Sequence, residues 1–269
     1  MSLECSSDEP DQDGLIEKVA AANPHTIVVL TTGSPELLPW SSKVAGIVEA
    51  WYPGEEGGTA LARMLFGDAD AEGRLPVTFA AHAGDVPAST PEQWPGTSDG
   101  GAVAPIFDVV PPPGNVLPPK SIYYTEGVLA GYRWYDARHI APAFPFGFGL
   151  SYTRWRYSQL RTTRDRVTVT VTNAGRRVGA DVAQLYVRIP SPAPGVVEPP
   201  QQLKGFQKVR LRAGRSQRVT FHLDDRSFAY WDVTRHAWTA QRGCYRVYVA
   251  RSSRDIVGRA TVPHGVSRC

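Results

Sequence analysis

The sequence predicts a chain of two unlike parts, a partial α/β sandwich domain followed by an all-β sandwich. The first part combines helical periodicity with continuous apolar β-branched runs, which are typical of strands covered on both faces. The second part carries short alternating strands separated by turn residues. Its 269 residues leave room for two ordinary domains, because domains usually run to ~100–200 residues.

The α/β part shows the order helix, strand, strand, helix. Apolar residues recur at helical spacing over residues 13–22, with an aspartate available as N-cap. Continuous apolar runs at residues 26–31 and 45–51 predict two buried strands of a parallel sheet. A second helix is predicted at residues 57–66, and Gly67 is suited to the left-handed conformation that ends helices.

These strands are too few for a complete doubly wound sheet. Only a short run at residues 75–79 adds a possible strand, before a Pro- and Gly-rich stretch at residues 80–120 that predicts a long loop. So small a sheet leaves an unpaired edge and apolar helix faces open to water. We therefore expect the chain by itself to be poorly soluble, or stable mainly through its second part.

An aromatic and glycine-rich segment at residues 123–153 joins the two parts. Gly147 and Gly149 predict a backbone that turns tightly or lies close to another surface, because glycine alone reaches positive φ without steric cost. Tyr132, Trp134 and Tyr135 of this segment, together with the earlier Trp51, offer aromatic rings that can stack on a ligand ring. Aromatics at such a junction more often anchor an interface, and packing is the favoured role.

The second part is built from short strands bounded by turns. Val167, Val169 and Val171 alternate with threonines, which predicts a half-buried antiparallel strand. Further strands are expected at residues 183–189, 202–209, 218–223, 228–232 and 244–251. This series predicts a β-sandwich of immunoglobulin-like or fibronectin type III architecture. The predicted boundaries are residues 1–79 for the truncated α/β domain, 80–153 for the loop and linker, and 154–269 for the β-sandwich.

Composition argues against several kinds of partner. The net charge of +3 is too weak to indicate nucleic acid or a membrane surface. No apolar run approaches the ~18 residues of a membrane span, and the N-terminal residues show no export signal. The compartment stays open between cytoplasmic and secreted. Cys5, Cys244 and Cys269 are odd in number and scattered, so we expect neither a disulfide framework nor a metal site, and no cofactor.

Motifs in both parts resemble family 3 glycoside hydrolases of the β-glucosidase type. In the linker, Y-x-E-G-x-x-x-G-Y-R begins at Tyr124 and F-x-F-G-x-G-L-S-Y-T begins at Phe144. W-Y-P-G-E-E-G-G, which begins at Trp51, is similar to the closing part of the family's C-terminal α/β sandwich domain. The V-T-N-A-G and Q-L-K-G-F motifs of the second part are similar to its terminal fibronectin type III-like domain. The resemblance covers residues 11–262.

The resemblance implies a retaining hydrolase of terminal β-linked glycosides. In this family a carboxylate nucleophile on an N-terminal (β/α)₈ barrel attacks the anomeric carbon, and a glutamate from the α/β sandwich protonates the leaving oxygen. The two carboxyl groups must lie about 5–5.5 Å apart. Since a barrel takes about 250 residues, the nucleophile is expected to be absent from this chain. The expected partners are therefore an upstream barrel polypeptide and, once complemented, a β-glycoside or oligosaccharide substrate.

Two glutamates are candidates for contact with the sugar. Glu4 is the acid/base candidate by position only, because the family's glutamate lies shortly before the first helix; the alternative is a polar, frayed N-terminus. Glu56 is a substrate-binding candidate, because it follows a strand and precedes a helix, where open α/β sheets commonly place ligand-facing groups. Its alternative role is a charge favourable to the helix N-terminus.

Two functions are compatible with these residues. The first is the C-terminal part of a β-glucosidase-like enzyme, inactive alone because one carboxylate cannot run a two-carboxylate mechanism. The second is a non-catalytic carbohydrate-associated or protein-interaction module. The sequence encoded immediately upstream discriminates between them, because only the first function requires a barrel with an aspartate nucleophile there.

Overall fold

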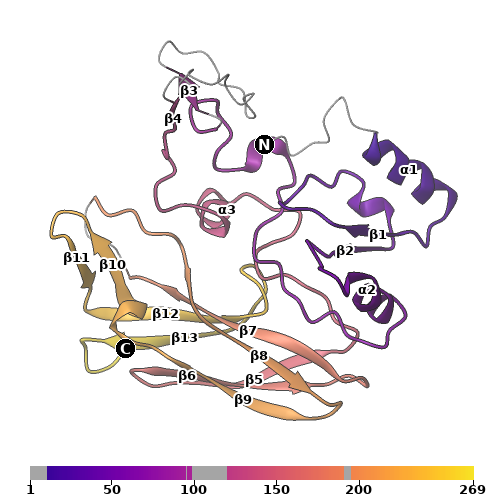
Figure 1. Ribbon diagram of the computed structural model, residues 1–269. Coiled ribbons are helices and arrows are strands. Elements are labelled where there is room, and N and C mark those ends of the chain that lie inside the picture. Colours follow the sequence, from indigo (N-terminus) through magenta and orange to yellow (C-terminus); the bar gives the residue numbers. More distant parts are fainter. Residues whose placement is uncertain (1–10, 95, 99–119, 191–194) are drawn as a thin grey trace. The chain divides into compact units, whose positions relative to one another are not determined.

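The computed structural model describes residues 11–94, 96–98, 120–190 and 195–269, which belong to two compact units (Figure 1). Each unit combines segments that are far apart in the sequence. The first unit comprises residues 1–52, 79–130 and 140–143, and the second comprises residues 53–78, 131–139 and 144–269. The domain boundaries expected at residues 79 and 153 stay a prediction.

The first unit contains the predicted helix and the predicted pair of parallel strands. Helix α1 (Gln12–Ala22) begins at Asp11, whose carboxylate accepts a hydrogen bond from the Gly14 backbone N–H at 2.7 Å. Strands β1 (Ile27–Leu30) and β2 (Gly46–Glu49) pair in parallel. They are joined by a connection that includes the 3₁₀ helix η1 (Ser41–Lys43).

The remainder of this unit has little regular structure among its described residues. It contains the 3₁₀ helix η2 (Ala83–Asp85) and two-residue strands β3 (Thr97–Ser98) and β4 (Lys120–Ser121), which pair antiparallel. Much of the predicted long loop, at residues 99–119, lies outside the described residues.

Several apolar side chains of the first unit are open to solvent. Leu15 and Val19 on α1 are 61% and 46% exposed, and Ile27 on β1 is 52% exposed. The exposed apolar surface expected from so small a sheet is therefore confirmed. Poor solubility of the chain stays a prediction.

The second unit contains a β-sandwich of two antiparallel sheets (Figure 1). One sheet has the order β13-β12-β7-β8 and the other the order β5-β6-β9, while β10 and β11 form a separate hairpin. The bounds are β5 (Trp155–Thr162), β6 (Arg166–Asn173), β7 (Gly179–Arg188), β8 (Gln202–Leu211), β9 (Ser216–His222), β10 (Ala229–Asp232), β11 (Ala237–Ala240), β12 (Gly243–Ala250) and β13 (Ile256–His264). The 3₁₀ helix η3 (Asp225–Phe228) precedes the hairpin.

Alternating side chains of both sheets meet in one apolar core. Val167 and Val171 of β6, Leu185 of β7 and Val247 of β12 are fully buried members of this core. Burial of apolar surface is the main favourable contribution to folding, so the sandwich has its own source of stability. The sandwich predicted from the valine and threonine alternation is confirmed.

Two helices of this unit precede the sandwich strands in the sequence. Helix α2 (Gly57–Leu65) is followed by Gly67, whose φ of +84° confirms the predicted left-handed terminator. Helix α3 (Tyr132–Arg138) was not predicted, because its seven residues are too few to show a helical periodicity.

The linker glycines make the close approaches that the sequence predicts. Gly147 has φ +80°, and a Cβ there would lie 2.4 Å from the Oε1 atom of Gln184. A Cβ on Gly149 would lie 2.6 Å from the carbonyl oxygen of Gly73. The backbone of Leu75 exchanges two 2.8 Å hydrogen bonds with this segment, to Gly147 and Phe148. The possible strand at residues 75–79 is therefore wrong: the structure places no strand there.

The aromatics of the linker anchor it to the sandwich. The ring of Tyr132 stacks on Phe146 at 4.9 Å between centroids and meets Tyr186 edge-on at 5.8 Å. Its hydroxyl accepts a 2.8 Å hydrogen bond from the backbone N–H of Leu203. A packing role for Tyr132, rather than sugar stacking, is confirmed.

A buried ion pair holds residue 74 to the sandwich. The Arg74 guanidinium lies 2.7 Å from an Asp181 oxygen, and their side chains are 8% and 1% exposed. The other Asp181 oxygen accepts a 2.8 Å hydrogen bond from the Tyr157 hydroxyl. Because both carboxylate oxygens are paired, the buried charge is compensated.

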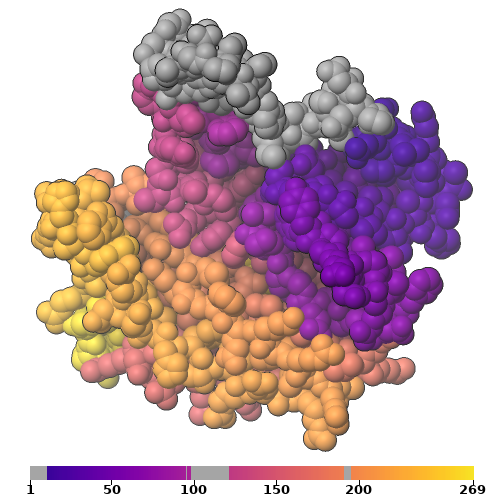
Figure 2. All heavy atoms as spheres, in the orientation of Figure 1, coloured from indigo at the N-terminus to yellow at the C-terminus, as the bar shows by residue number. Residues whose placement is uncertain are grey.

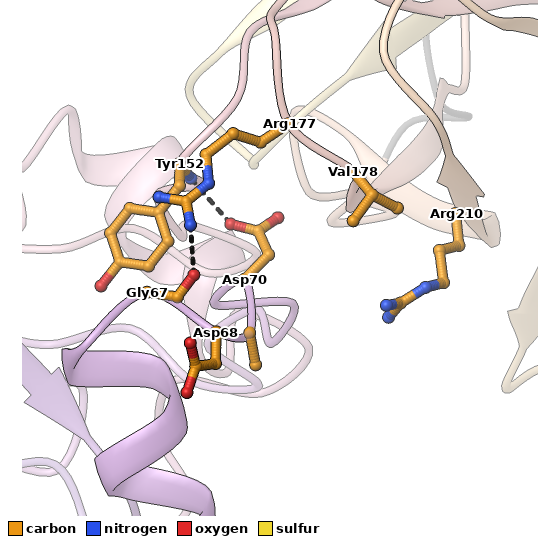
Figure 3. A pocket seen from close by; sticks show the side chains of 8 residues that line it. Gly67, Asp68, Asp70, Tyr152, Arg177, Val178 and Arg210 are labelled. Carbon is orange, nitrogen blue, oxygen red and sulfur yellow. Dashed lines mark hydrogen bonds between the residues drawn. The ribbon is translucent and has the colours of Figure 1, made fainter.

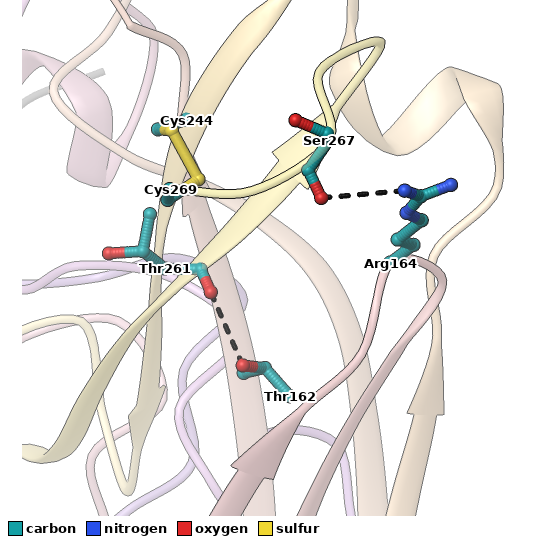
Figure 4. The surroundings of a disulfide bond; sticks show 6 residues. All are labelled: Thr162, Arg164, Cys244, Thr261, Ser267 and Cys269. Atoms are coloured by element: carbon teal, nitrogen blue, oxygen red, sulfur yellow. Dashed lines mark hydrogen bonds between the residues drawn. A yellow bond between two sulfur atoms is a disulfide. The ribbon is translucent and has the colours of Figure 1, made fainter.

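A disulfide bond joins Cys244 to Cys269 (Figure 4). The expectation that the cysteines form no disulfide is wrong. Cys244 lies on β12, and the antiparallel β13 runs back beside it so that Gly243 is paired with His264. Spacing in the sequence does not reveal this return of the chain. Figure 4 also shows Thr162 donating to the Thr261 carbonyl at 3.2 Å, next to the bridge.

Candidate functional site

The carboxyl ends of β1 and β2 bring polar side chains together in the first unit. The parallel register places Leu30 opposite Glu49, so the residues after β1 lie beside the end of β2. The Thr32 hydroxyl donates to Glu49 Oε2 at 3.1 Å, and the Trp51 backbone N–H donates to Glu49 Oε1 at 2.8 Å. Open α/β sheets bind ligands at this edge.

A second carboxyl group, that of Glu36, lies at the same edge. It accepts a 3.0 Å hydrogen bond from the Ser34 hydroxyl. Burial raises the pKa of Glu36, the charge of Glu49 raises it further, and the Ser34 hydrogen bond opposes both. A carboxyl group whose pKa is raised keeps its proton closer to neutral pH and can donate it to an oxygen atom of a ligand.

Trp51 follows this edge in a strained conformation. Its φ of +53° is left-handed, which is rare for a bulky residue. Its ring packs at 6.1 Å from that of Phe79, in line with the packing role expected for this tryptophan. Strained backbones of this kind cluster at functional sites.

Sequence reasoning missed Glu36 and Glu49. Both carry a readable signal, because Glu49 is the one charged residue within the second apolar run and Glu36 follows the first run in T-T-G-S-P-E. In a parallel sheet the residues after neighbouring strands meet at one edge. Their proximity depends on the register of the two strands, which only the structure supplies.

The predicted site residues are placed as follows. Glu56 occupies the N-cap position of α2 in the second unit, where it is exposed and its side chain makes no capping hydrogen bond. A ligand contact and a favourable charge at the helix N-terminus both stay predictions for it. Glu4 lies outside the described residues.

Over the described ranges no group of three or more His, Cys, Asp or Glu side chains is arranged to hold a metal ion, and no helix is long and apolar enough to cross a membrane.

A hollow of about 190 Å³ in the second unit has a structural explanation (Figure 3). Arg177 donates to the Gly67 carbonyl, and the Tyr152 hydroxyl donates to the Met64 carbonyl at 2.9 Å. Asp70 accepts from the Tyr152 backbone N–H at 2.7 Å. The Arg177 and Tyr152 bonds add partners to backbone carbonyls around the end of α2, where the Met64 carbonyl also accepts from the Gly67 backbone N–H at 3.1 Å. The residues around the hollow therefore have a structural role, because their hydrogen bonds hold the end of α2.

Two family profiles match the chain. The glycosyl hydrolase family 3 C-terminal domain matches residues 3–152. The fibronectin type III-like domain matches residues 181–253.

Related proteins of known name share both parts. A β-glucosidase of Rhizobium radiobacter is 42% identical over 260 residues, which cover 93% of this chain and 29% of that protein. Thermostable β-glucosidase B of Acetivibrio thermocellus is 36% identical, with 94% and 31% covered. An exo-α-(1→6)-L-arabinopyranosidase of Bifidobacterium longum is 37% identical, with 93% and 31% covered. The chain spans under a third of the length of each of these relatives.

Solved structures agree with this relationship. The β-glucosidase DesR of Streptomyces venezuelae, in complex with D-glucose, aligns with a TM-score of 0.82 at 36% identity, covering 94% of this chain and 30% of that one. A GH3 β-glucosidase of Bifidobacterium adolescentis aligns with a TM-score of 0.83 at 36% identity, covering 97% and 36%. The chain therefore belongs to glycosyl hydrolase family 3, and it comprises that family's C-terminal domain followed by a fibronectin type III-like domain.

Proposed function

We propose that this chain is the C-terminal part of a retaining enzyme that hydrolyses terminal β-linked glycosides. The observation that carries the proposal is the match of 93% of the chain to a β-glucosidase. The sugar itself is left open, because a relative of similar identity is named an arabinopyranosidase.

The mechanism divides the two required carboxyl groups between two parts of the enzyme. A retaining glycosidase needs a nucleophile and an acid/base residue about 5–5.5 Å apart. In our proposal a barrel supplies the nucleophile, and the α/β part of this chain supplies the acid/base residue, for which Glu4 is the candidate by position. Glu56 contributes a hydrogen bond to a sugar hydroxyl. Glu36 and Glu49 hold the strand edge beside which the substrate binds.

It follows that the 269 residues alone do not hydrolyse glycosides. The test compares this chain with a chimera in which it replaces the matching region of the Rhizobium radiobacter β-glucosidase. We expect the chimera to hydrolyse p-nitrophenyl β-glucoside and the chain alone to be inactive. A folded but inactive chimera would favour the alternative, a non-catalytic module. Hydrolysis by the chain alone that is abolished by Glu56→Gln would overturn the proposal that the nucleophile and the acid/base residue come from two different parts of the enzyme.

Variants of the chimera distinguish the role proposed for Glu4 from the role proposed for Glu56. Glu4→Gln removes the proposed proton donor, so hydrolysis of an alkyl β-glucoside should fall by about 10²–10⁴-fold. A dinitrophenyl β-glucoside should be cleaved with a much smaller loss in the first step, because its leaving group needs no proton. Glu56→Gln should raise KM, whereas Glu55→Gln, a change at the neighbouring exposed glutamate, should leave KM unchanged.

A further inference from the structure

The two parts of the chain carry opposite charges. Residues 154–269 hold 22 Lys and Arg against 7 Asp and Glu, a formal charge of +15 with the histidines neutral. Residues 1–153 hold 7 Lys and Arg against 19 Asp and Glu, a formal charge of −12. The net charge of +3 is the small difference between these two values. Such an asymmetry indicates that the basic part interacts with an acidic partner.

Four arginines share the outer face of the β5-β6-β9 sheet, and we call this surface the arginine face. It consists of Arg156 and Arg161 of β5, Arg166 of β6 and Arg218 of β9, all of them exposed. In the strand register they lie in rows that alternate with those of the buried β6 valines, so they point away from the core. Figure 2 shows salmon and orange atoms of the sandwich along its lower rim, where Figure 1 draws these strands.

Carboxylates do not balance these charges. The positions that the register aligns on this face carry Ser, Thr and His beside the arginines, and no Asp or Glu. Arg166 lies 3.9 Å from Asp165, with side chains 48% and 65% exposed, and so distant an exposed pair contributes little. Within the part of the chain that the structure describes, the side chains of Arg156, Arg161 and Arg218 form no ion pair or hydrogen bond. Their charges are therefore available to a partner.

The side chains of the arginine face select the chemistry of that partner. A planar guanidinium donates two parallel hydrogen bonds to the oxygens of a carboxylate or phosphate, whereas lysine, which the face lacks, acts as a point charge. Hydroxyl groups lie between the arginines: Thr168 and Thr220 share a row with Arg161, and Ser158 shares a row with Arg218. Hydroxyls both donate and accept hydrogen bonds. They suit a partner that carries hydroxyl groups beside its anionic groups.

The flat shape and the lack of exposed aromatics argue against other polyanions. No large apolar side chain of β5, β6 or β9, which the structure describes in full, is exposed. Proteins hold single-stranded nucleic acids by stacking bases on aromatic rings, and amphipathic segments bind membrane surfaces through apolar anchors. The grooves of duplex DNA admit a helix or a two-stranded ribbon rather than the face of a three-stranded sheet. An extended acidic polysaccharide requires none of these features.

We propose that the arginine face binds a linear polysaccharide whose sugar rings carry carboxylate groups. The guanidinium groups bind the carboxylates, and the neighbouring Ser and Thr hydroxyls bind hydroxyl groups of the rings. The inference rests on the charge and the strand register of the sandwich, and it does not depend on which glycoside the enzyme cleaves. It gives the sandwich a role in attaching the protein to an acidic polymer.

The test measures the fluorescence anisotropy of labelled oligogalacturonate titrated with the full 269-residue chain. We expect saturable binding that weakens as salt screens the charges, and no binding of the methyl-esterified oligomer, whose carboxyl groups are neutral. Arg156→Gln combined with Arg218→Gln should weaken binding about tenfold, through the loss of two exposed charge-assisted contacts. The matched control combines Arg235→Gln with Arg268→Gln, which removes the same charge from exposed residues outside the face. It should bind nearly as well as the unchanged chain.

Two further measurements separate specific binding from general attraction. Arg156→Lys combined with Arg218→Lys keeps the charge and loses the paired hydrogen bonds, so its affinity should lie between those of the unchanged chain and the glutamine variant. The chimera with the Rhizobium radiobacter β-glucosidase should bind like the chain by itself. Circular dichroism confirms that each variant is folded.

The proposal is overturned if the unchanged chain binds no oligogalacturonate, if the methyl ester binds as tightly, or if the control variant loses as much affinity as the Arg156 and Arg218 variant. It is also overturned if duplex DNA or vesicles of phosphatidylglycerol bind more tightly than oligogalacturonate. Loss of binding in the chimera would overturn it too, by showing that the rest of the enzyme covers the face. None of these outcomes depends on hydrolysis, so failure of this proposal and failure of the proposed function are distinguishable.

Discussion

The sandwich and the first unit differ in how completely each buries its own apolar surface. In the sandwich, two sheets enclose a core in which Val167 and Val247 are fully buried. Among the described residues of the first unit, β1 and β2 pair only with each other, and Leu15 and Ile27 are more than half exposed. The sandwich thus encloses its own core, whereas Glu36 and Glu49 lie in a unit that leaves large apolar side chains exposed.

One ion pair from each unit shows a similar contrast in burial. Arg74 and Asp181 in the second unit are almost fully buried, whereas Lys43 and Glu17 in the first unit pair at 2.7 Å with side chains 53% and 42% exposed. Removing one member of a buried pair leaves a buried charge without compensation. In an exposed pair, water hydrates the remaining charge, so the loss costs little.

The largest effect is expected from breaking the buried pair. Arg74→Ala leaves the Asp181 carboxylate buried without its cation, so the free energy of unfolding of the sandwich should fall by about 3–5 kcal/mol. Lys43→Ala is the matched change in the exposed pair and should cost less than about 1 kcal/mol. Urea denaturation followed by circular dichroism measures both, and equal losses would contradict the contrast.

The next largest effect is expected at the disulfide. Cys244→Ser opens the bridge to Cys269, which spans 25 residues. Loss of such a cross-link should lower the free energy of unfolding of the sandwich by ~3 kcal/mol, mainly through greater freedom of the unfolded chain. Thermal unfolding measures the change. Cys5→Ser is the control, and a similar loss there would show that the bridge is not the cause.

A smaller effect is expected from the linker glycine. Gly147→Ala adds a Cβ 2.4 Å from the Gln184 side chain at φ +80°, so Gln184 must move and lose hydrogen bonds. We expect a loss of about 2–3 kcal/mol in the free energy of unfolding, the sum of left-handed strain and an unsatisfied amide. Gly214→Ala has a similar φ of +71° but open space around its Cβ. It should cost only ~1–2 kcal/mol, from left-handed strain alone.

The smallest effect concerns the pH dependence of the first unit. The pKa of Glu36 is raised above its ordinary value of 4.5 in the folded state. Folding therefore favours the protonated carboxyl, and this contribution to stability is fully present below pH 4.5 and lost as the pH rises through the raised pKa. Glu36→Gln should remove this pH dependence.

A carboxyl titration checks the cause of the Glu36 shift. Glu49→Gln removes the neighbouring negative charge and should move the pKa of Glu36 part of the way back. Carbon-13 NMR of the Glu36 carboxyl measures the pKa in both proteins. An unchanged pKa in the Glu49→Gln variant would show that the two carboxyl groups do not interact.

Elements with a strong local pattern were predictable from the sequence. The alternation at residues 167–171 identified β6, and the apolar runs near β1 and β2 identified a parallel pair. Strand β5 escaped prediction, because a bulge between Ser158 and Arg161 breaks its alternation. Strand β13 contains Gly258 and Pro263, which are unfavourable in strand interiors.

Features that depend on long-range register were not predictable. The Cys244–Cys269 bridge requires the return of β13 beside β12, and the proximity of Glu36 and Glu49 requires the parallel pairing of β1 with β2. The arginine face likewise requires the register of β5, β6 and β9. Each involves residues brought together by strand pairing, which local spacing does not specify.

Hydrogen exchange tests most directly our proposal that the sandwich is stable by itself, while the α/β part is stabilised by the barrel of a larger enzyme. In the chain alone, amides of β1 and β2 should exchange much faster than those of β6 and β12. In the chimera with the Rhizobium radiobacter β-glucosidase, β1 and β2 should become protected while β6 and β12 change little. Equal protection of all four strands in the chain alone, with one cooperative unfolding transition of a monomer, would contradict the account.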